Sequence, residues 1–328
     1  YTMSNKVKTA VAAVTLAVSS TSFAGGHSGC GDVSIGAMGW ASAETFAEIS
    51  SFVLEQGYGC TVSVIPTDTV PAVTSLAENN EPDIVLEVWR NSAPAYPGLV
   101  EEGKVITASS MFGSGGNEGW WIPQYLVDEH PELATLEGIL DNPELVGGRF
   151  HNCPVGWGCR LVNDNLKVVH DLEGRGFEVF NHGSGANLGA ALAAAYEERQ
   201  PWFGYYFGPT AILGKYKMHQ IDIGPIDPEV HAENQKENAD PDKIGVSGFP
   251  AAPVLNAITA SFADREPEVA EFVKRFSIPN NIISEMLAWK DENIASADEA
   301  AAYVLQNHKD LILDMVNDSA REKLNALL

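Results

Sequence analysis

Short apolar runs alternate with amphipathic stretches through the first hundred residues that follow the N-terminal segment. Apolar runs at residues 33–36, 60–66 and 83–88 have the length of strands, and the stretches at about 43–56 and 67–79 have helical periodicity. The order strand, helix, strand, helix, strand predicts a parallel sheet with right-handed crossovers. In such sheets a ligand binds at the carboxyl ends of the strands.

A glycine-rich stretch at residues 113–119 interrupts this pattern. Glycine allows large backbone changes at low cost, so we expect the chain to cross into a second domain here. Beyond it, the pattern predicts a helix at 132–140, an alanine-rich helix at 187–198 and a strand at 202–207. The second block is therefore expected to be another small α/β domain.

The rest of the chain is polar at first and then helical. Residues 222–250 are rich in polar and turn-forming types, which predicts a long solvated loop, and residues 267–328 have helical periodicity. We expect this helical part to pack back on the first domain. The predicted organisation is thus one domain from 25–116 plus 222–328, a second from 117–221, and a ligand cleft between them.

The first 24 residues have the features of an export signal. Lys6 and Lys8 precede an apolar run at 9–18, and Ser22-Phe23-Ala24 provides the small residues that a signal peptidase needs. We expect cleavage after Ala24, which places the mature protein in the periplasm. No other window approaches the roughly 20 apolar residues of a membrane helix, so no stable membrane insertion is expected.

The formal net charge of −24 at pH 7 limits the kinds of partner. A surface this acidic repels nucleic acid and anionic lipid. Nucleic-acid binding is therefore not expected.

Four cysteines in a chain that carries an export signal permit disulfides. Of the three possible pairings we favour Cys30 with Cys60, and Cys153 with Cys159 across a five-residue loop. Free buried thiols remain an alternative. Zinc is less favoured, because neither Cys-x-x-Cys nor His-x3-His spacing occurs.

The polar loop also contains acidic residues that offer hard oxygen ligands. These weak candidates for a structural calcium site are Glu233, Glu237, Asp240 and Asp242. Their spacing matches no known calcium-binding loop, and a solvated loop is the simpler interpretation. We therefore expect no cofactor.

Motifs of catalysis are absent from the sequence. There is no Walker loop, His-Glu-x-x-His or dinucleotide fingerprint, and Ser184 lacks the Gly-x-Ser-x-Gly frame of a nucleophile elbow. A helix N-cap is the ordinary role for Ser184. A non-enzyme is expected, and an exported hydrolase acting through Ser184, His182 and a distant carboxylate is the rival class.

Tryptophan is the most informative residue type in this chain. A methylated cation over an indole face gains roughly 0.5–2 kcal/mol, and three or four such rings form a cage. Core packing is the alternative for each ring, and Trp289, within a helical pattern, is assigned to the core. The tryptophans at strand ends and in loops are Trp40, Trp89, Trp120, Trp121, Trp157 and Trp202.

Several of these tryptophans lie in segments that resemble a known family. The chain resembles the substrate-binding components of glycine betaine, choline and carnitine importers. The resemblance implies a two-lobed Venus-flytrap fold (type II-like α/β), an aromatic box for a trimethylammonium head, no catalysis, a monomer, and an ABC transporter permease as partner. The segments that carry it are Gly39-Trp40 and residues 83–89, 120–125, 154–159 and 201–206.

Two departures from the family pattern affect the expected ligand. Ser42 stands where choline binders of this type have an acidic residue. The pattern Tyr-Tyr-Trp-x-Pro here has Phe207 in place of tryptophan, which leaves open whether Trp202 or Phe207 closes the box. We expect Ser42, Tyr206 or the backbone N–H groups of 183–187 to receive an oxygen of the ligand.

These features favour a ligand whose positive nitrogen is balanced by its own oxygen. Trimethylamine N-oxide is the first candidate, and glycine betaine, choline and carnitine are alternatives. A binder of anionic solutes is a further alternative, which needs an arginine for the carboxylate. Arg90 is the candidate near a predicted strand end.

Overall fold

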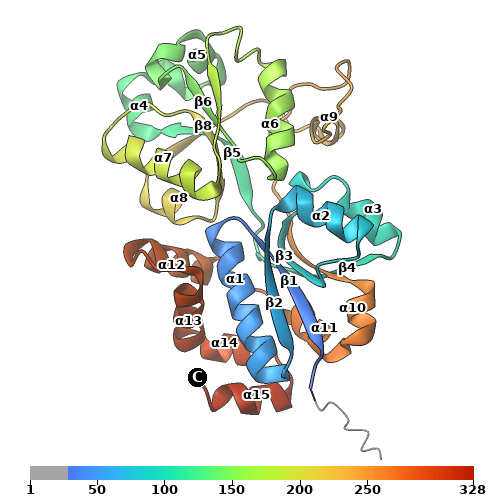
Figure 1. Ribbon diagram of the computed structural model, residues 1–328. Coiled ribbons are helices and arrows are strands. Elements are labelled where there is room, and N and C mark those ends of the chain that lie inside the picture. The colour runs from blue at the N-terminus through green and yellow to red at the C-terminus, as the bar shows by residue number, and fades with distance from the viewer. Residues whose placement is uncertain (1–28) are drawn as a thin grey trace, which may run out of the picture.

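The computed structural model describes residues 29–328, so the predicted export signal at 1–24 lies outside the described residues. Two five-stranded sheets form the framework (Figure 1). The first has the order β2-β1-β3-β10-β4 and the second the order β7-β6-β8-β5-β9. We call the parts built around these sheets lobe I and lobe II. The predicted two-lobed α/β fold is confirmed.

The sheet of lobe I begins with the three strands that the pattern predicted. β1 (Asp32–Met38) pairs in parallel with β2 (Thr61–Thr67) and with β3 (Ile84–Trp89). β10 (Val254–Thr259) lies antiparallel between β3 and β4 (Val105–Ser110). β10 was not predicted, because its apolar run follows a polar stretch and pairs only with strands far away in the sequence.

The helices of lobe I cover both faces of this sheet. α1 (Ala41–Phe52) continues into a π-helical turn at Val53–Tyr58, and α2 (Thr69–Glu78) and α3 (Tyr96–Glu101) follow β2 and β3. The π-helical turn ends at Gly59, whose φ of 74° suits glycine. α1 and α2 begin directly after β1 and β2, so their N-termini lie at the carboxyl edge of the sheet.

The sheet of lobe II is mixed. β6 (Arg149–Asn152) is parallel to β7 (Glu178–Asn181) and β8 (Gly204–Gly208). β5 (Asn117–Pro123) is antiparallel to β8 and to β9 (Met218–Ile221). The chain enters this sheet through the glycine-rich crossing before β5, and it returns to lobe I after β9.

One predicted helix of lobe II is divided in two. A 3-10 turn at Pro131–Ala134 precedes α5, which begins at Leu136. The prediction of one helix at 132–140 was wrong because the side chain of Thr135 accepts the N–H of Gly138 and starts a new helix. The helices of this lobe are α4 (Gln124–Glu129), α5 (Leu136–Asp141), α6 (Gly158–Val169), α7 (Gly185–Glu197) and α8 (Ala211–Lys215).

The returning segment, predicted to be a solvated loop over 222–250, contains α9 (Pro228–Asn234) and several buried polar residues. Asp227 caps this helix by accepting the N–H groups of Glu229 and Val230. The fully buried Asn234 donates to the carbonyl of Gly245, 2.9 Å away. Polar residues that satisfy one another inside a fold look like a loop in the sequence, which is why the prediction was wrong.

The C-terminal helices pack on lobe I, as expected. α13 lies against α1, and α15 against the π-helical turn (Figure 1). Within 29–328 no helix is both long and apolar enough to cross a membrane. These helices are α10 (Ala260–Arg265), α11 (Pro267–Arg275), α12 (Asn280–Glu292), α13 (Ala297–Asn307), α14 (Lys309–Leu313) and α15 (Asp318–Asn325).

Both disulfides have the pairing that we favoured. Cys30 is joined to Cys60, which ties the segment before β1 to the start of β2. Cys153 is joined to Cys159, which links the end of β6 to the first turn of α6.

Candidate ligand-binding site

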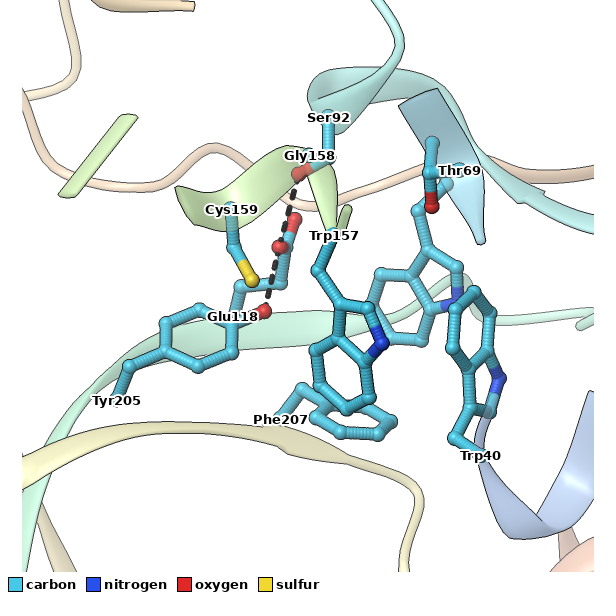
Figure 2. A pocket seen from close by; sticks show the side chains of 10 residues that line it. Trp40, Thr69, Ser92, Glu118, Trp157, Gly158, Cys159, Tyr205 and Phe207 are labelled. Carbon is cyan, nitrogen blue, oxygen red and sulfur yellow. Dashed lines mark hydrogen bonds between the residues drawn. The ribbon is translucent and has the colours of Figure 1, made fainter. Parts of the chain in front are cut away.

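A small cavity lies between the two lobes and is walled by aromatic rings (Figure 2). Its free volume is about 20 Å³, close to what a single water molecule requires, so a larger ligand requires the rings to move apart. Both lobes contribute to its wall. The lining residues are Trp40, Thr69, Trp89, Ser92, Glu118, Trp157, Gly158, Cys159, Tyr205 and Phe207.

Three of the rings in the cavity wall lie at the ends of helices or strands, and a fourth lies within a strand. Trp40 is the N-cap residue of α1, two residues after the end of β1, and Trp89 is the last residue of β3. Trp157 is the N-cap residue of α6, and Phe207 lies in β8. Trp40 and Trp89 therefore occupy the carboxyl ends of neighbouring parallel strands, where ligands of such sheets bind.

These four rings, which we call the aromatic box, meet nearly at right angles. The ring centroids of Trp40 and Trp157 are 5.3 Å apart at 78°, and those of Trp89 and Phe207 are 5.4 Å apart at 86°. Trp157 and Phe207 are also 5.4 Å apart, at 82°. Perpendicular neighbours form the adjacent walls of a box, and each edge-to-face pair contributes about 0.5–1.5 kcal/mol beyond its buried area. Several π faces can thus surround one methylated nitrogen.

The carboxylate of Glu87 holds two of these walls, and sequence reasoning missed it. Its Oε1 accepts the indole N–H of Trp40 at 2.6 Å and that of Trp89 at 3.2 Å. Ser42, expected to contact ligand, instead donates its hydroxyl to the same oxygen at 3.0 Å. Burial raises the pKa of Glu87 to about 7, against the lowering effect of these three hydrogen bonds. The available signal was a glutamate within an otherwise apolar strand.

A second buried carboxyl, Glu118 of β5, lines the cavity and joins the lobes. Its Oε1 accepts the hydroxyl of Ser92 from lobe I at 3.2 Å and that of Tyr205 from lobe II at 2.7 Å (Figure 2). Its Oε2 is buried and has no partner within the described part of the chain. Burial raises the pKa of Glu118 to about 7, although both hydroxyl hydrogen bonds lower it. Glu118 thus lines the cavity with one carboxyl oxygen left without a hydrogen-bond partner among the described residues.

Lobe I also fixes the ring of Trp157, which belongs to lobe II. Oδ1 of Asp68 accepts the indole N–H of Trp157 at 3.0 Å and the N–H of Gly39 at 3.3 Å. Beside it, the N–H of Val70 donates to the carbonyl of Gly156 at 3.0 Å. The box is thus complete in the closed arrangement of the two lobes that the structure shows.

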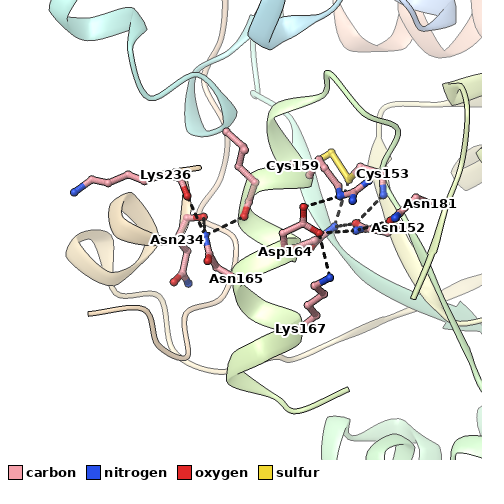
Figure 3. A network of polar contacts seen from close by, with 12 residues as sticks. Asn152, Cys153, Cys159, Asp164, Asn165, Lys167, Asn181, Asn234 and Lys236 are labelled. Atoms are coloured by element: carbon pink, nitrogen blue, oxygen red, sulfur yellow. Dashed lines mark hydrogen bonds and ion pairs between the residues drawn. A yellow bond between two sulfur atoms is a disulfide. The ribbon is translucent and has the colours of Figure 1, made fainter. Parts of the chain in front are cut away.

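A polar network in lobe II holds the N-terminus of α6, where Trp157 stands (Figure 3). Oδ1 of Asn152 accepts the N–H of Cys153 at 2.8 Å and the amide of Asn163 at 2.9 Å. Farther along α6, Asn165 donates to the carbonyls of Asn234 and Lys236, next to α9. The disulfide and these amides together fix α6 against β6 and against the returning segment.

Three of the predicted box residues do not line the cavity. Trp120 is fully buried in lobe II, with its centroid 4.7 Å from that of Phe150 and its N–H on Asn163. Trp121 donates to the carbonyl of Tyr206, and Trp202 stacks on His151 at 5.2 Å. Interior packing, the alternative for each tryptophan, describes these three. Trp202 is thus outside the box, and Phe207 stands in its wall.

Tyr206 lies in a larger groove beside the box. This groove, of about 620 Å³, shares Trp40, Trp157 and Phe207 with the cavity and also includes Ser42. Small residues of α7 and the end of α12 line its other sides. Trp289 of α12 stacks on Tyr303, with centroids 4.5 Å apart, away from the cavity.

The structure does not assemble the rival sites. Ser184 caps α7 by accepting the N–H of Asn187, whereas Nε2 of His182 lies 2.9 Å from Nδ1 of His151. Burial, together with His182 and Arg149, lowers the pKa of His151 to about 3. Arg90 does not line the cavity or the groove.

The weak calcium candidates are not brought together either. Glu233 accepts the N–H of Asp240 at 2.9 Å and pairs with Lys236, and Asp240 pairs with Lys243. In residues 29–328 no group of three or more His, Cys, Asp or Glu side chains is placed to hold a metal ion. Backbone N–H groups and lysines bind the carboxylates of Glu233 and Asp240. Glu237 and Asp242 do not join them in a cluster that could hold a metal ion.

Three solved structures with a similar two-lobed fold are 14–18% identical to this chain. A choline-binding protein of an ABC transporter, in complex with choline, has a TM-score of 0.72 at 18% identity and covers 91% of this chain and 98% of its own. A glycine betaine/L-proline-binding protein from Borrelia burgdorferi has a TM-score of 0.70 at 14% identity, covering 89% and 99%. A lactococcal protein in its closed-liganded conformation with glycine betaine has a TM-score of 0.67 at 16% identity, covering 87% and 99%.

The sequence supplies the assignment that such distant structural likeness cannot. The profile that matches residues 31–307, most of the chain, is described as the substrate binding domain of ABC-type glycine betaine transport systems. The chain therefore belongs to the family of substrate-binding domains of ABC-type glycine betaine transport systems.

Proposed function

We propose that this chain is a periplasmic, non-enzymatic binding protein that captures trimethylamine N-oxide in the aromatic box and delivers it to an ABC transporter permease. The observation that carries the proposal is the pairing of four ring faces with one unpartnered carboxyl oxygen, Oε2 of Glu118, at the same cavity. The rings suit three methyl groups on a positive nitrogen. The carboxyl suits a polar atom attached to that nitrogen.

The chemistry of Glu118 favours an N-oxide over the alternatives. A protonated Glu118 keeps the hydrogen bonds from Ser92 and Tyr205 on Oε1 and offers an O–H from Oε2 to an acceptor. The oxygen of trimethylamine N-oxide is such an acceptor, attached directly to the nitrogen. With its pKa raised to about 7, Glu118 keeps this proton through much of the range below neutral pH.

Glycine betaine and choline are the alternatives. The carboxylate of glycine betaine calls for a cationic partner, and the residues that line the cavity include no lysine or arginine. Choline is a cation, so an ionised Glu118 would strengthen its binding. The structural likeness to a choline-binding protein is a second reason to consider choline. The protonation state of Glu118 therefore separates the candidates.

Titration calorimetry at pH 6 and pH 8 with trimethylamine N-oxide, glycine betaine, choline, carnitine and proline tests the proposal. We expect trimethylamine N-oxide to bind most tightly of the five, and the proton on Glu118 to favour its binding at pH 6 over pH 8. Glu118→Gln keeps an N–H donor without a titrating proton, so its affinity for trimethylamine N-oxide should increase relative to that of the wild type between pH 6 and pH 8. Choline binding that strengthens with pH and exceeds that of trimethylamine N-oxide would overturn the assignment.

The aromatic box is tested separately. Trp40→Ala, Trp89→Ala and Trp157→Ala should each reduce affinity by about 2- to 30-fold, because each removes one ring worth roughly 0.5–2 kcal/mol. Trp289→Phe, which alters a ring on α12 outside the cavity, is the matched control and should bind normally. Unchanged affinity in the three box variants would exclude the box as the binding site.

A further inference from the structure

Glu87 occupies an unusual position for a charged residue. It is the fourth residue of β3, every residue of which is buried, and its own side chain is fully inaccessible. Its φ of 58° lies in the left-handed region, where a non-glycine residue costs about 1–3 kcal/mol. The N–H of Glu87 donates to the side chain of Asn256, next to an irregularity in the pairing of β3 with β10. The fold thus holds Glu87 in this conformation against a backbone penalty.

The donors around Glu87 suit an ionised carboxylate. Three of them, two indole N–H groups and the hydroxyl of Ser42, converge on Oε1. Hydrogen bonds to a carboxylate are stronger than those to a neutral acceptor. Oε2 has no partner among the described residues, so a proton on it would be a buried donor without an acceptor. A positive nitrogen in the neighbouring box would further favour the charged form.

When an indole N–H donates to a carboxylate, the negative charge shifts electron density of the indole towards its ring face. Hydrogen bonds in a low-dielectric interior polarise one another, and cations are attracted by the negative potential of the ring face. Trp40 and Trp89 are two of the four box walls, and both donate to the same Oε1 of Glu87. A negative charge on Glu87 therefore makes the electrostatic potential at the cavity-facing sides of Trp40 and Trp89 more negative.

We propose that Glu87 is a specificity-determining residue, whose negative charge acts through the indoles of Trp40 and Trp89 to make the box prefer a positively charged nitrogen over a neutral group of the same shape. The inference rests on the proposed function, since it requires a methylated nitrogen in the box. Glu87 does not line the cavity, so it acts on the ligand through the two indoles.

Glu87→Gln tests the role of the charge. The glutamine carbonyl can still accept from both indoles and from Ser42, so the walls should keep their positions. Glu55→Gln, the same change at an exposed site of lobe I, is the matched control and should leave binding unchanged. Two pairs of ligands are compared: trimethylamine N-oxide with tert-butanol, and choline with 3,3-dimethylbutan-1-ol. In the second compound of each pair, carbon replaces the positive nitrogen. Binding of all four is followed by calorimetry or chemical-shift titration.

We expect Glu87→Gln to lower the affinity for trimethylamine N-oxide by about tenfold while leaving tert-butanol binding within about twofold, so that the preference for nitrogen shrinks. Equal losses for both members of a pair, or no loss, would overturn the inference and show that Glu87 only positions the rings. Failure of the wild-type protein to bind any trimethyl compound would instead overturn the proposed function.

Nuclear magnetic resonance of the indole N–H groups gives a readout that needs no ligand. In the wild type the Trp40 and Trp89 protons should resonate downfield, as expected for donors to a carboxylate. In Glu87→Gln both should move upfield while remaining protected from exchange, whereas the Trp120 signal, whose acceptor is Asn163, should stay in place. Unmoved Trp40 and Trp89 signals would contradict polarisation by Glu87.

Discussion

The indole N–H of Trp157 in lobe II donates a hydrogen bond of 3.0 Å to Oδ1 of Asp68 in lobe I. Trp157 is a wall of the aromatic box, so the same contact that joins the lobes also orients a ring towards the cavity. A ligand that requires this wall thereby favours the closed arrangement. Binding and closure are coupled because they share one side chain.

Replacing Asp68 should weaken ligand binding more than it weakens the fold. Asp68→Ala leaves the N–H groups of Trp157 and Gly39 without their acceptor, and we expect affinity to fall by about tenfold. Calorimetry measures the affinity, and thermal unfolding without ligand should change little. Asp68→Asn retains an acceptor oxygen and is the control; a loss as large as that of the alanine variant would show that charge, not the hydrogen bond, matters.

Gly158 is placed so that any side chain would prevent closure. A Cβ at this first residue of α6 would lie 1.7 Å from the carbonyl oxygen of Ser92, which belongs to the opposite lobe. Gly158→Ala should therefore fold with open lobes and lose about 100-fold in affinity, or ~2.7 kcal/mol. Small-angle scattering with and without ligand would show whether compaction is lost.

Gly214→Ala is the matched control for this change, because a Cβ on that residue of α8 meets nothing within 4 Å. It should bind and close normally. Normal compaction of Gly158→Ala with ligand would mean that the two lobes close differently from the arrangement described above.

Glu118 should contribute a loss of stability to the ligand-free protein as the pH rises from about 4.5 to 7, and His151, whose pKa is lowered to about 3, acts in the opposite direction. The pKa of Glu118 is raised to about 7 from its ordinary value of 4.5 because its charged form is buried. In this range the carboxyl of Glu118 retains a proton in the folded protein that it releases in the unfolded chain, so its contribution to the free energy of unfolding falls by up to ~1.4 kcal/mol per pH unit. Glu87, with its pKa also raised to about 7, acts in the same direction.

Thermal unfolding of the wild type and of Glu118→Gln across this pH range measures the effect. The stability of the glutamine variant relative to the wild type should rise with pH across this range, because the variant lacks the loss that Glu118 contributes. Identical slopes for the two proteins would show that Glu118 is not responsible.

The two disulfides should have separable effects. Cys153→Ser with Cys159→Ser opens a short loop, which costs about 2 kcal/mol in the free energy of unfolding, and it loosens the segment that contains Trp157. Cys30→Ser with Cys60→Ser opens a longer loop, costs about 3–4 kcal/mol, and lies away from the cavity. Denaturant unfolding and calorimetry should therefore show that the first pair lowers affinity and the second lowers mainly stability.

The sequence by itself determined the local elements and where several rings would stand. The alternation of apolar runs and helical stretches predicts β1 to β3 with their helices, and the ends of those strands place Trp40 and Trp89 at one edge of the sheet. Cysteine spacing indicated the pairing that the structure shows. These features depend on neighbours in the sequence, whose preferences a pattern records.

Only the tertiary structure decided which residues face one another. Trp120 and Trp157 look alike in the sequence, but β5 directs one into the interior of lobe II and the N-terminus of α6 brings the other to the cavity. Glu87 and Glu118 appear as single charges in apolar strands, and their partners, such as Ser92 and Tyr205, come from other strands and from the other lobe. The burial of a charge and the closure of two lobes depend on contacts between distant segments, which no local pattern specifies.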